Sequence, residues 1–387
     1  MFEIKCNRRK LLVLGSASLL AGCQVIPHTP PANVAPPVSP SGTNLPTDLE
    51  RHRVALLVPL SGTNGAAGQS LANATTMALL DTNATNLRIT TYDTSLGAPA
   101  AAARAVADGN KLILGPLMGD DAVAVATTAK AARVPVISYS NDFSVAGDGV
   151  FVMGPIPAQS ITRVVKHAAA EGAKTFAALI PIGTYGERAS TAMIAAVRAS
   201  GGTLVGMESY DRTKGTLPAA VRRLKAHGAY DAVLVADTGG VSVQAAPLLK
   251  AGPTATAVPL RILGTDLWNG EAGVARAPAL AGAWFAAMSD QRFLRFANAY
   301  KARFGAQPYR IATLGYDSVL LTLRIAREWK PGTTFPISRL YDRGGFLGSD
   351  GIFRFGANNV IERALEVREV RGGATTVVSP APGRFED

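Results

Sequence analysis

The feature that most constrains the fold of this chain is a regular alternation of short apolar runs with longer helix-like segments between residues 53 and 287. Residues 53–60 form the first run, a near-continuous apolar stretch of strand length, as expected for a strand that is buried on both faces. A polar, glycine-containing turn at 61–65 follows, and then a helix to about residue 80. Alternation of this kind builds parallel sheets that are covered by helices on both faces.

The same rhythm repeats along the chain. Further strands are predicted at 87–93, 111–114, 135–138, 175–180, 203–207, 232–236, 261–264 and 283–287. Helices are predicted at 98–107, 120–132, 217–227 and 241–250, and helical spacing of apolar residues marks two more around 161–168 and 193–197. With this many strands in 387 residues, we expect two doubly wound α/β lobes rather than one very wide sheet.

Composition supports a globular chain that folds through its apolar core. Apolar residues make up 48% and charged residues 17%, which excludes a disordered or disulfide-rich protein. The only cysteines are Cys6 and Cys23, so we expect neither a structural disulfide nor a cysteine metal site.

The first 22 residues have the anatomy of a secretory signal peptide. Basic residues between positions 5 and 10 precede an apolar run at 11–20 that is too short to span a membrane. Leu20-Ala21-Gly22-Cys23 resembles the lipobox of bacterial lipoproteins, which implies cleavage before Cys23 and lipidation of that residue. The alternative is a stray cysteine in an ordinary secretory signal. Gln24 follows in place of Asp, and by resemblance to Gram-negative lipoproteins this implies the outer membrane rather than the inner one.

The segment from Cys23 to residue 50 is predicted to be an extended tether. It holds Pro27, Pro30, Pro31, Pro36, Pro37, Pro40 and Pro46 among small polar residues. Prolines fix the backbone and remove amide donors, so the 27 residues from 24 to 50 would span about 80 Å in polyproline geometry. Without residues 1–22 the net charge falls from +11 to +8.

Enzyme and nucleic-acid functions find little support in the sequence. The four histidines, His28, His52, His167 and His227, all lie outside the loops that follow the predicted strands, which disfavours a catalytic relay or a histidine metal site. Neither a nucleophile elbow nor a phosphate-binding glycine loop occurs. The basic cluster at 212–225 lacks interleaved aromatic residues and is read as a solvated helix face. We therefore expect no enzyme activity, cofactor, metal or nucleic-acid partner.

The loops after the strands carry a family resemblance. Five segments, 58–62, 114–117, 134–138, 185–186 and 264–269, resemble in order and spacing the type I periplasmic binding-protein fold of the leucine-binding kind. This resemblance implies two lobes that are joined by three hinge crossovers and close on a ligand. It places lobe 1 at 51–156 plus 286–332, lobe 2 at 157–285 plus 333–378, and a C-terminal tail at 379–387. The crossovers are then expected at 155–157, 285–288 and 330–334.

A finer resemblance concerns one branch of that superfamily. Residues 138–142, 264–269 with 282–285, and 345–355 resemble the lipoproteins named penicillin-binding protein activators. The branch implies a partner, a peptidoglycan synthase, rather than a transport function.

The leucine-binding resemblance also implies candidate ligand residues at the strand ends. These candidates are Asn64, Met118, Gly119, Ser140, Asn141, Asp142, Tyr185, Asp266 and Trp268. Tyr185 matches a tyrosine that covers the ligand, and Asp266 matches an acidic partner of the ligand ammonium. Gly119, however, replaces the serine that holds the ligand carboxylate, and Asp142 stands where a threonine is expected, so a neutral amino acid fits poorly.

Each candidate also has a purely structural interpretation. Tyr185 could begin a helix, Trp268 could pack in the core, and Asn64, Ser140 and Asn141 are common turn residues.

Two functions follow from the sequence. The first is a non-enzymatic envelope lipoprotein that activates a penicillin-binding protein, which the outer-membrane address and the altered carboxylate loop favour. The alternative is the substrate-binding lipoprotein of an ABC importer for an amino acid or related small molecule, with an ABC permease as its partner.

Overall fold

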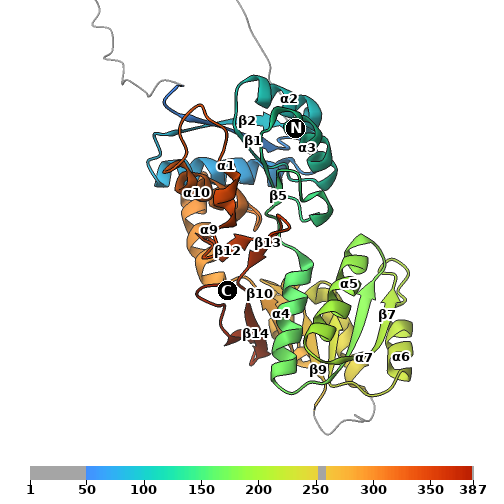
Figure 1. Ribbon diagram of the computed structural model, residues 1–387. Coiled ribbons are helices and arrows are strands. Elements are labelled where there is room, and N and C mark those ends of the chain that lie inside the picture. The colour runs from blue at the N-terminus through green and yellow to red at the C-terminus, as the bar shows by residue number, and fades with distance from the viewer. Residues whose placement is uncertain (1–48, 252–258, 386–387) are drawn as a thin grey trace, which may run out of the picture. The chain divides into compact units, whose positions relative to one another are not determined.

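The computed structural model describes residues 49–251 and 259–385 (Figure 1). The predicted signal peptide at 1–22, the lipidated Cys23 and almost all of the tether lie outside the described residues, as do the last two residues of the tail. Among the described residues, no helix is both long enough and apolar enough to cross a membrane.

The first lobe is built on a parallel sheet in the order β2-β1-β3-β4-β5. Its strands are β1 (His52–Val58), β2 (Leu87–Asp93), β3 (Leu112–Leu114), β4 (Val136–Ser138) and β5 (Val150–Val152). Residues 54–58 of β1 are fully buried, because alternate side chains face helices on opposite sides of the sheet. Ala55 and Leu57 pack with α2 (Ala98–Ala107) and α3 (Gly119–Ala132). Leu56 and its neighbours pack toward α1 (Gly65–Asp81) and α10 (Ala312–Ala326).

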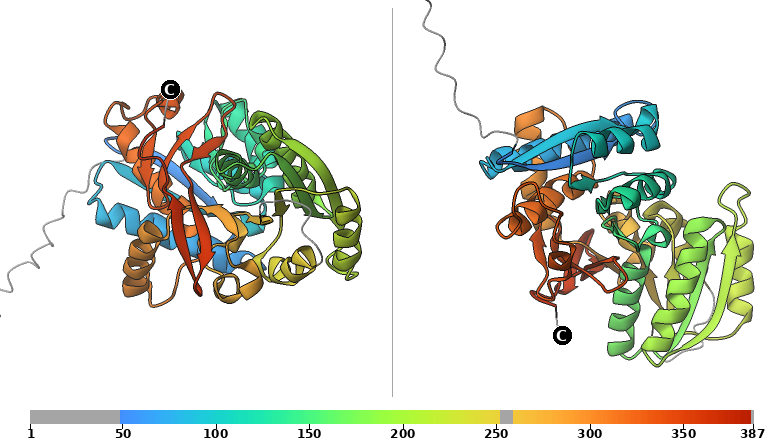
Figure 2. Two further views of the ribbon diagram at one scale, coloured as in Figure 1. Left: turned by 90° about the horizontal axis from the view of Figure 1, so that it is seen from below. Right: turned by 45° about the horizontal axis from the view of Figure 1, so that its top comes forward.

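The second lobe is built on a seven-stranded sheet in the order β15-β14-β10-β9-β8-β6-β7. Five parallel strands, β6 (Thr175–Pro181), β7 (Thr203–Tyr210), β8 (Ala232–Val235), β9 (Arg261–Gly264) and β10 (Trp284–Ala287), adjoin two antiparallel ones, β14 (Glu366–Arg371) and β15 (Ala374–Ser379). One face packs on α4 (Pro157–Ala170) and α5 (Thr184–Ala199), drawn in green in Figure 2. The other packs on α6 (Leu217–Ala226), α7 (Gly239–Lys250) and the short α8 (Ala272–Arg276). The predicted α/β class with parallel sheets is confirmed.

The C-terminal third differs from the predicted division of the lobes. After β10 the chain returns to the first lobe as α9 (Asp290–Phe304) and α10, which pack beside α1. It then forms a small antiparallel sheet of β11 (Phe346–Gly348), β12 (Gly351–Phe355) and β13 (Ile361–Arg363).

This small sheet belongs to the first lobe, although the sequence assigns 333–378 to the second. Phe346, Phe353 and Ile361 share one apolar cluster with β1, and the ring centroid of Phe355 lies 5.2 Å from that of Phe151 on β5. The third crossover therefore follows β13, between residues 363 and 366, rather than lying at 330–334. Burial of these aromatic side chains against the first-lobe core accounts for the difference.

Candidate functional site

Six of the candidate residues, Asn64, Met118, Gly119, Ser140, Asn141 and Asp142, lie in the loops at the carboxyl ends of the first-lobe strands. Asn64 precedes α1 and Met118 precedes α3, and the Nδ2 of Asn64 donates to the Sδ of Met118 at 3.4 Å. Met118 is 41% exposed and lies at the surface of this loop cluster. Ser140 is buried, and its Oγ accepts a hydrogen bond from the amide of Asp142 at 3.0 Å.

Gly119 and Asp142 depend on each other sterically. A Cβ at position 119 would lie 3.2 Å from both the Cβ and the Oδ2 of Asp142, and 3.4 Å from the Oγ of Ser140. The Asp142 side chain thus fills the space that a serine at 119 would use. Glycine in place of the expected serine at 119 and aspartate in place of the expected threonine at 142 are therefore linked changes in one site.

The Asp142 carboxylate is well supplied with donors. Its Oδ1 accepts from the amide of Ser144 at 3.1 Å and from the Ser144 hydroxyl at 2.7 Å, which begins the 3-10 turn at Phe143–Val145. The Ser144 hydroxyl, followed by the Ser144 amide and the Arg188 guanidinium, holds the pKa of Asp142 below its usual range.

Arg188 joins the two lobes at this point, and sequence reasoning missed it. It lies on α5 of the second lobe, and its Nη2 is 2.8 Å from the Oδ1 of Asp142. Its Nη1 donates to the carbonyl of Asn141 at 3.4 Å, and its guanidinium lies 5.6 Å from the centroid of the Phe143 ring. The available signal is its position three residues after Tyr185, which places both side chains on one face of the helix.

The second-lobe candidates Tyr185 and Asp266 lie among hydroxyl groups. The hydroxyl of Tyr185 is 3.3 Å from the Oγ1 of Thr265, and the Oγ of Ser160 donates to the Oδ1 of Asp266 at 2.7 Å. Tyr185 is partly buried, and its burial raises the pKa of the phenol to about 12. Burial also raises the pKa of Asp266, opposed by the hydrogen bond from Ser160.

Beside them is a buried ion-pair cluster that follows β8 and consists of Asp237, Arg212 and Tyr210, none of which is a sequence-predicted site residue. Arg212 binds the Asp237 carboxylate with two donors, Nε at 2.7 Å and Nη2 at 2.8 Å, and the hydroxyl of Tyr210 donates to the same group. Asp237 is fully buried, whereas the Arg212 side chain is 45% exposed. Such a bidentate pair fixes the ends of β7 and β8 and the loops that follow them.

Trp268 occupies the core rather than the ligand site. It is 1% exposed, its Nε1 donates to the carbonyl of Asp237 at 3.2 Å, and it packs beside Phe285. A Cβ at residue 264 would lie 2.2 Å from its indole ring, so Gly264 is required for this packing. The structural interpretation of Trp268 is the one observed.

The candidates therefore form two polar groups, one in each lobe, and the contact between Asp142 and Arg188 connects them. No cluster of three or more metal-ligating side chains occurs among residues 49–251 and 259–385. The arrangement can hold a polar molecule through hydroxyl and carboxylate groups.

Comparisons with known proteins agree with this arrangement. The sequence model described as periplasmic binding protein matches residues 52–374. A curated relative, an uncharacterized protein of Rickettsia prowazekii (strain Madrid E), is 29% identical over 173 residues, which are 44% of this chain and 46% of the relative. The match thus spans about half the length of that relative.

Several solved structures of transport proteins resemble the chain. A putative branched-chain amino acid ABC transporter from Rhodospirillum rubrum is 21% identical with a TM-score of 0.74, and the match covers 85% of this chain and 100% of the Rhodospirillum chain. A branched-chain amino acid ABC transporter periplasmic ligand-binding protein from Burkholderia xenovorans is 17% identical with a TM-score of 0.67, covering 86% and 95%. A leucine binding protein from Thermotoga maritima is 19% identical with a TM-score of 0.61, covering 85% and 98%. At these identities the likeness establishes the fold.

Proposed function

The chain belongs to the periplasmic binding protein family, and from this premise we propose that it captures a small organic molecule between its two lobes for an ABC importer. The observation that carries the proposal is the contact between the lobes at the candidate residues, where Asp142 of the lobe 1 loop pairs with Arg188 on α5, the helix that also carries Tyr185. Hinge closure on a ligand is a common motion of two-lobe proteins. The similar structures from Burkholderia xenovorans and Rhodospirillum rubrum, which are described as branched-chain amino acid ABC transporter proteins, support the same choice.

The charges at the site favour a ligand that carries an amine and lacks a free carboxylate beside it. Asp266 accepts a side-chain hydrogen bond from Ser160 and has no ion pair with any described residue, so a ligand ammonium would satisfy it. In lobe 1, Gly119 offers no hydroxyl, and Asp142 places a negative charge where the carboxylate of an amino acid is expected. A second carboxylate there would be repelled.

Isothermal titration calorimetry tests this proposal with leucine, leucinamide and a panel of biogenic amines. At least one amine should bind the wild-type chain, leucinamide should bind more tightly than leucine, and Asp266→Asn should lose most of the affinity. Asp148→Asn is the matched control, since that carboxylate is exposed and pairs with Lys130 in lobe 1. If no compound in the panel binds, or if Asp266→Asn binds like wild type, the proposal fails.

A second candidate is the activation of a penicillin-binding protein. The observation that favours it is the rearranged loop of lobe 1. Asp142 already binds Ser144 and Arg188, and Gly119 has no hydroxyl that could bind a ligand carboxylate. Crosslinking in cells should then recover a peptidoglycan synthase, while no metabolite shifts the melting temperature. Recovery of a permease together with a ligand-dependent melting shift would exclude this candidate in favour of the importer.

We further propose that Cys23 anchors the chain by lipid to the periplasm-facing side of a membrane, with the outer membrane as its address. The support is the Leu20-to-Cys23 segment and Gln24. Membrane fractionation tests it, because Cys23→Ser should release the protein from the membrane. An inner-membrane location would favour the importer, whose permease lies there, over the activator.

A further inference from the structure

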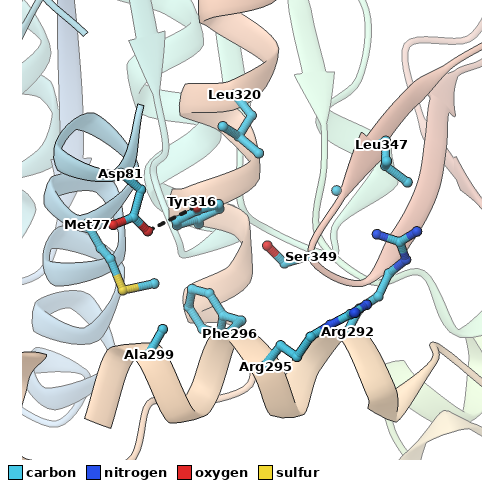
Figure 3. Close-up of a pocket in the computed structure, with 11 residues that line it drawn as sticks. Met77, Asp81, Arg292, Arg295, Phe296, Ala299, Tyr316, Leu320, Leu347 and Ser349 are labelled. Atoms are coloured by element: carbon cyan, nitrogen blue, oxygen red, sulfur yellow. Dashed lines mark hydrogen bonds between the residues drawn. The ribbon is translucent and has the colours of Figure 1, made fainter. Parts of the chain in front are cut away.

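A pocket in the first lobe shares no residue with the candidate ligand site. It has a volume of about 480 Å³ and lies between α1, α9, α10 and the turn that joins β11 to β12 (Figure 3). Its lining consists of Met77, Asp81, Arg292, Arg295, Phe296, Ala299, Tyr316, Leu320, Leu347, Gly348 and Ser349. The size falls within the range of about 300–1,000 Å³ that is usual for sites of small molecules.

The floor of the pocket is apolar. Met77 of α1 is 1% exposed and Phe296 of α9 is 6% exposed, and both belong to the cluster that packs α9 onto α1. Leu320 of α10 extends this surface, and Leu347 stands at the rim with 56% of its surface exposed. Because burial of apolar surface is favourable, a ligand that covers this exposed leucine would be bound more tightly.

Asp81, the acidic residue that lines the pocket, already has partners within the protein. The Oδ1 of Asp81 accepts from the Nη1 of Arg303 at 2.9 Å, and its Oδ2 accepts from the hydroxyl of Tyr316 at 3.1 Å. Figure 3 shows Asp81 and Tyr316 on one side of the pocket and the two arginines with Leu347 on the other. Both oxygens of Asp81 therefore bind other residues, and Asp81 does not form an ion pair with Arg292 or Arg295.

Arg292 and Arg295 supply two uncompensated positive charges. They lie three residues apart on α9, which places them on neighbouring turns of one helix face. Within the part of the chain that the structure describes, neither guanidinium has an ion pair or hydrogen bond. Guanidinium groups bind carboxylate or phosphate with two parallel hydrogen bonds.

We propose that this pocket binds a small amphipathic anion, whose aliphatic or aromatic body lies on Met77, Phe296 and Leu320 while its carboxylate or phosphate is held by Arg292 and Arg295. Leu347 covers the apolar body from the β11–β12 side. The proposal is independent of the ligand between the lobes, because the two sites have no residue in common.

Calorimetric titration of the full chain with decanoate and with decyl phosphate tests this assignment. At least one of these anions should bind, and decylamine, which has the same apolar chain and the opposite charge, should not. The double variant R292E/R295E should weaken anion binding at least tenfold, and Leu347→Asp should weaken it severalfold.

The matched control is R198E/R222E, which reverses the charge of two exposed arginines on α5 and α6. It should bind the anion like wild type, and unchanged circular dichroism of all variants separates lost binding from lost folding. Equal binding of decylamine, undiminished binding by R292E/R295E, or the absence of binding by both anions would overturn the proposal. Binding of an acidic peptide in place of both anions would also overturn it, since the pocket would then be a protein docking surface.

Discussion

Two carboxylates at the strand ends, Asp142 in the first lobe and Asp266 in the second, have opposite surroundings. Asp142 receives hydrogen bonds from Ser144 and an ion pair from Arg188, which lower its pKa. Asp266 receives a side-chain hydrogen bond from Ser160, and its burial raises its pKa. Under the proposed function, the Asp142 carboxylate is paired within the protein, whereas the Asp266 carboxylate would bind the ligand, so the second lobe would supply most of the recognition.

The largest expected effect on stability concerns Trp268, the buried residue that follows Asp266 in the same 3-10 turn. Trp268→Ala should lower the free energy of unfolding by about 3–5 kcal/mol, because it removes a fully buried indole that packs on Gly264 and Phe285. Chemical denaturation followed by circular dichroism measures this loss. Leu294→Ala, at a residue that is 56% exposed, serves as the control and should change stability by less than about 1 kcal/mol. A similar small change for Trp268→Ala would contradict its placement in the core.

A smaller effect is expected where Gly119 meets Asp142. Gly119→Ser should cost about 1–2 kcal/mol, because the new Cβ would press against the Asp142 side chain. Combining it with Asp142→Thr should recover part of this loss, which a double-mutant cycle detects.

Gly240→Ser is the matched control for this crowding. Gly240 also lies in the first turn of a helix, but the nearest atom to its Cβ position is 4.0 Å away. Additive effects of the two substitutions at 119 and 142 would show that the positions are independent.

The smallest effect is a difference in pH dependence between the two carboxylates. The folded-state pKa of Asp142 lies below its usual 3.8, so its contribution to stability is present above pH 3.8 and is lost as the pH falls through the folded value. The folded-state pKa of Asp266 lies above 3.8, so its ionisation costs stability at neutral pH, and this cost disappears as the pH falls through the raised value.

Thermal unfolding between pH 3 and pH 7 distinguishes the two. Asp142→Asn should destabilise the protein most at pH 7, whereas Asp266→Asn should relieve a cost there and lose that advantage in acid. The same pH trend for both variants would contradict the assigned difference.

Local pattern predicts most of the strands and helices of this fold. Predicted strands at 87–93 and 261–264 have the observed bounds, because a short run with apolar, β-branched or aromatic residues between turn residues marks a strand without knowledge of its neighbours. The sheet of β11 to β13 could not be assigned to a lobe in this way, since its place depends on aromatic packing against Phe151, about 200 residues earlier in the chain. The position of the third crossover depends on the same packing.

The candidate site was predictable only in part. Motif resemblance predicts that the loops of Ser140, Tyr185 and Asp266 bind a ligand, but neither the pairing of Arg188 with Asp142 nor the buried Asp237 cluster follows from spacing along the chain. Both are tertiary contacts between elements that lie more than 20 residues apart. Trp268 is expected in the ligand site because it lies in a ligand-loop motif, but its side chain is buried in the core.

A side-by-side titration of Asp142→Asn and Asp266→Asn with the tightest-binding amine tests the central claim most directly. The account predicts that Asp266→Asn loses at least tenfold in affinity, because the ligand ammonium loses its carboxylate, while Asp142→Asn stays within about fivefold of wild type. The reverse order, with Asp142→Asn binding more weakly than Asp266→Asn, would contradict it.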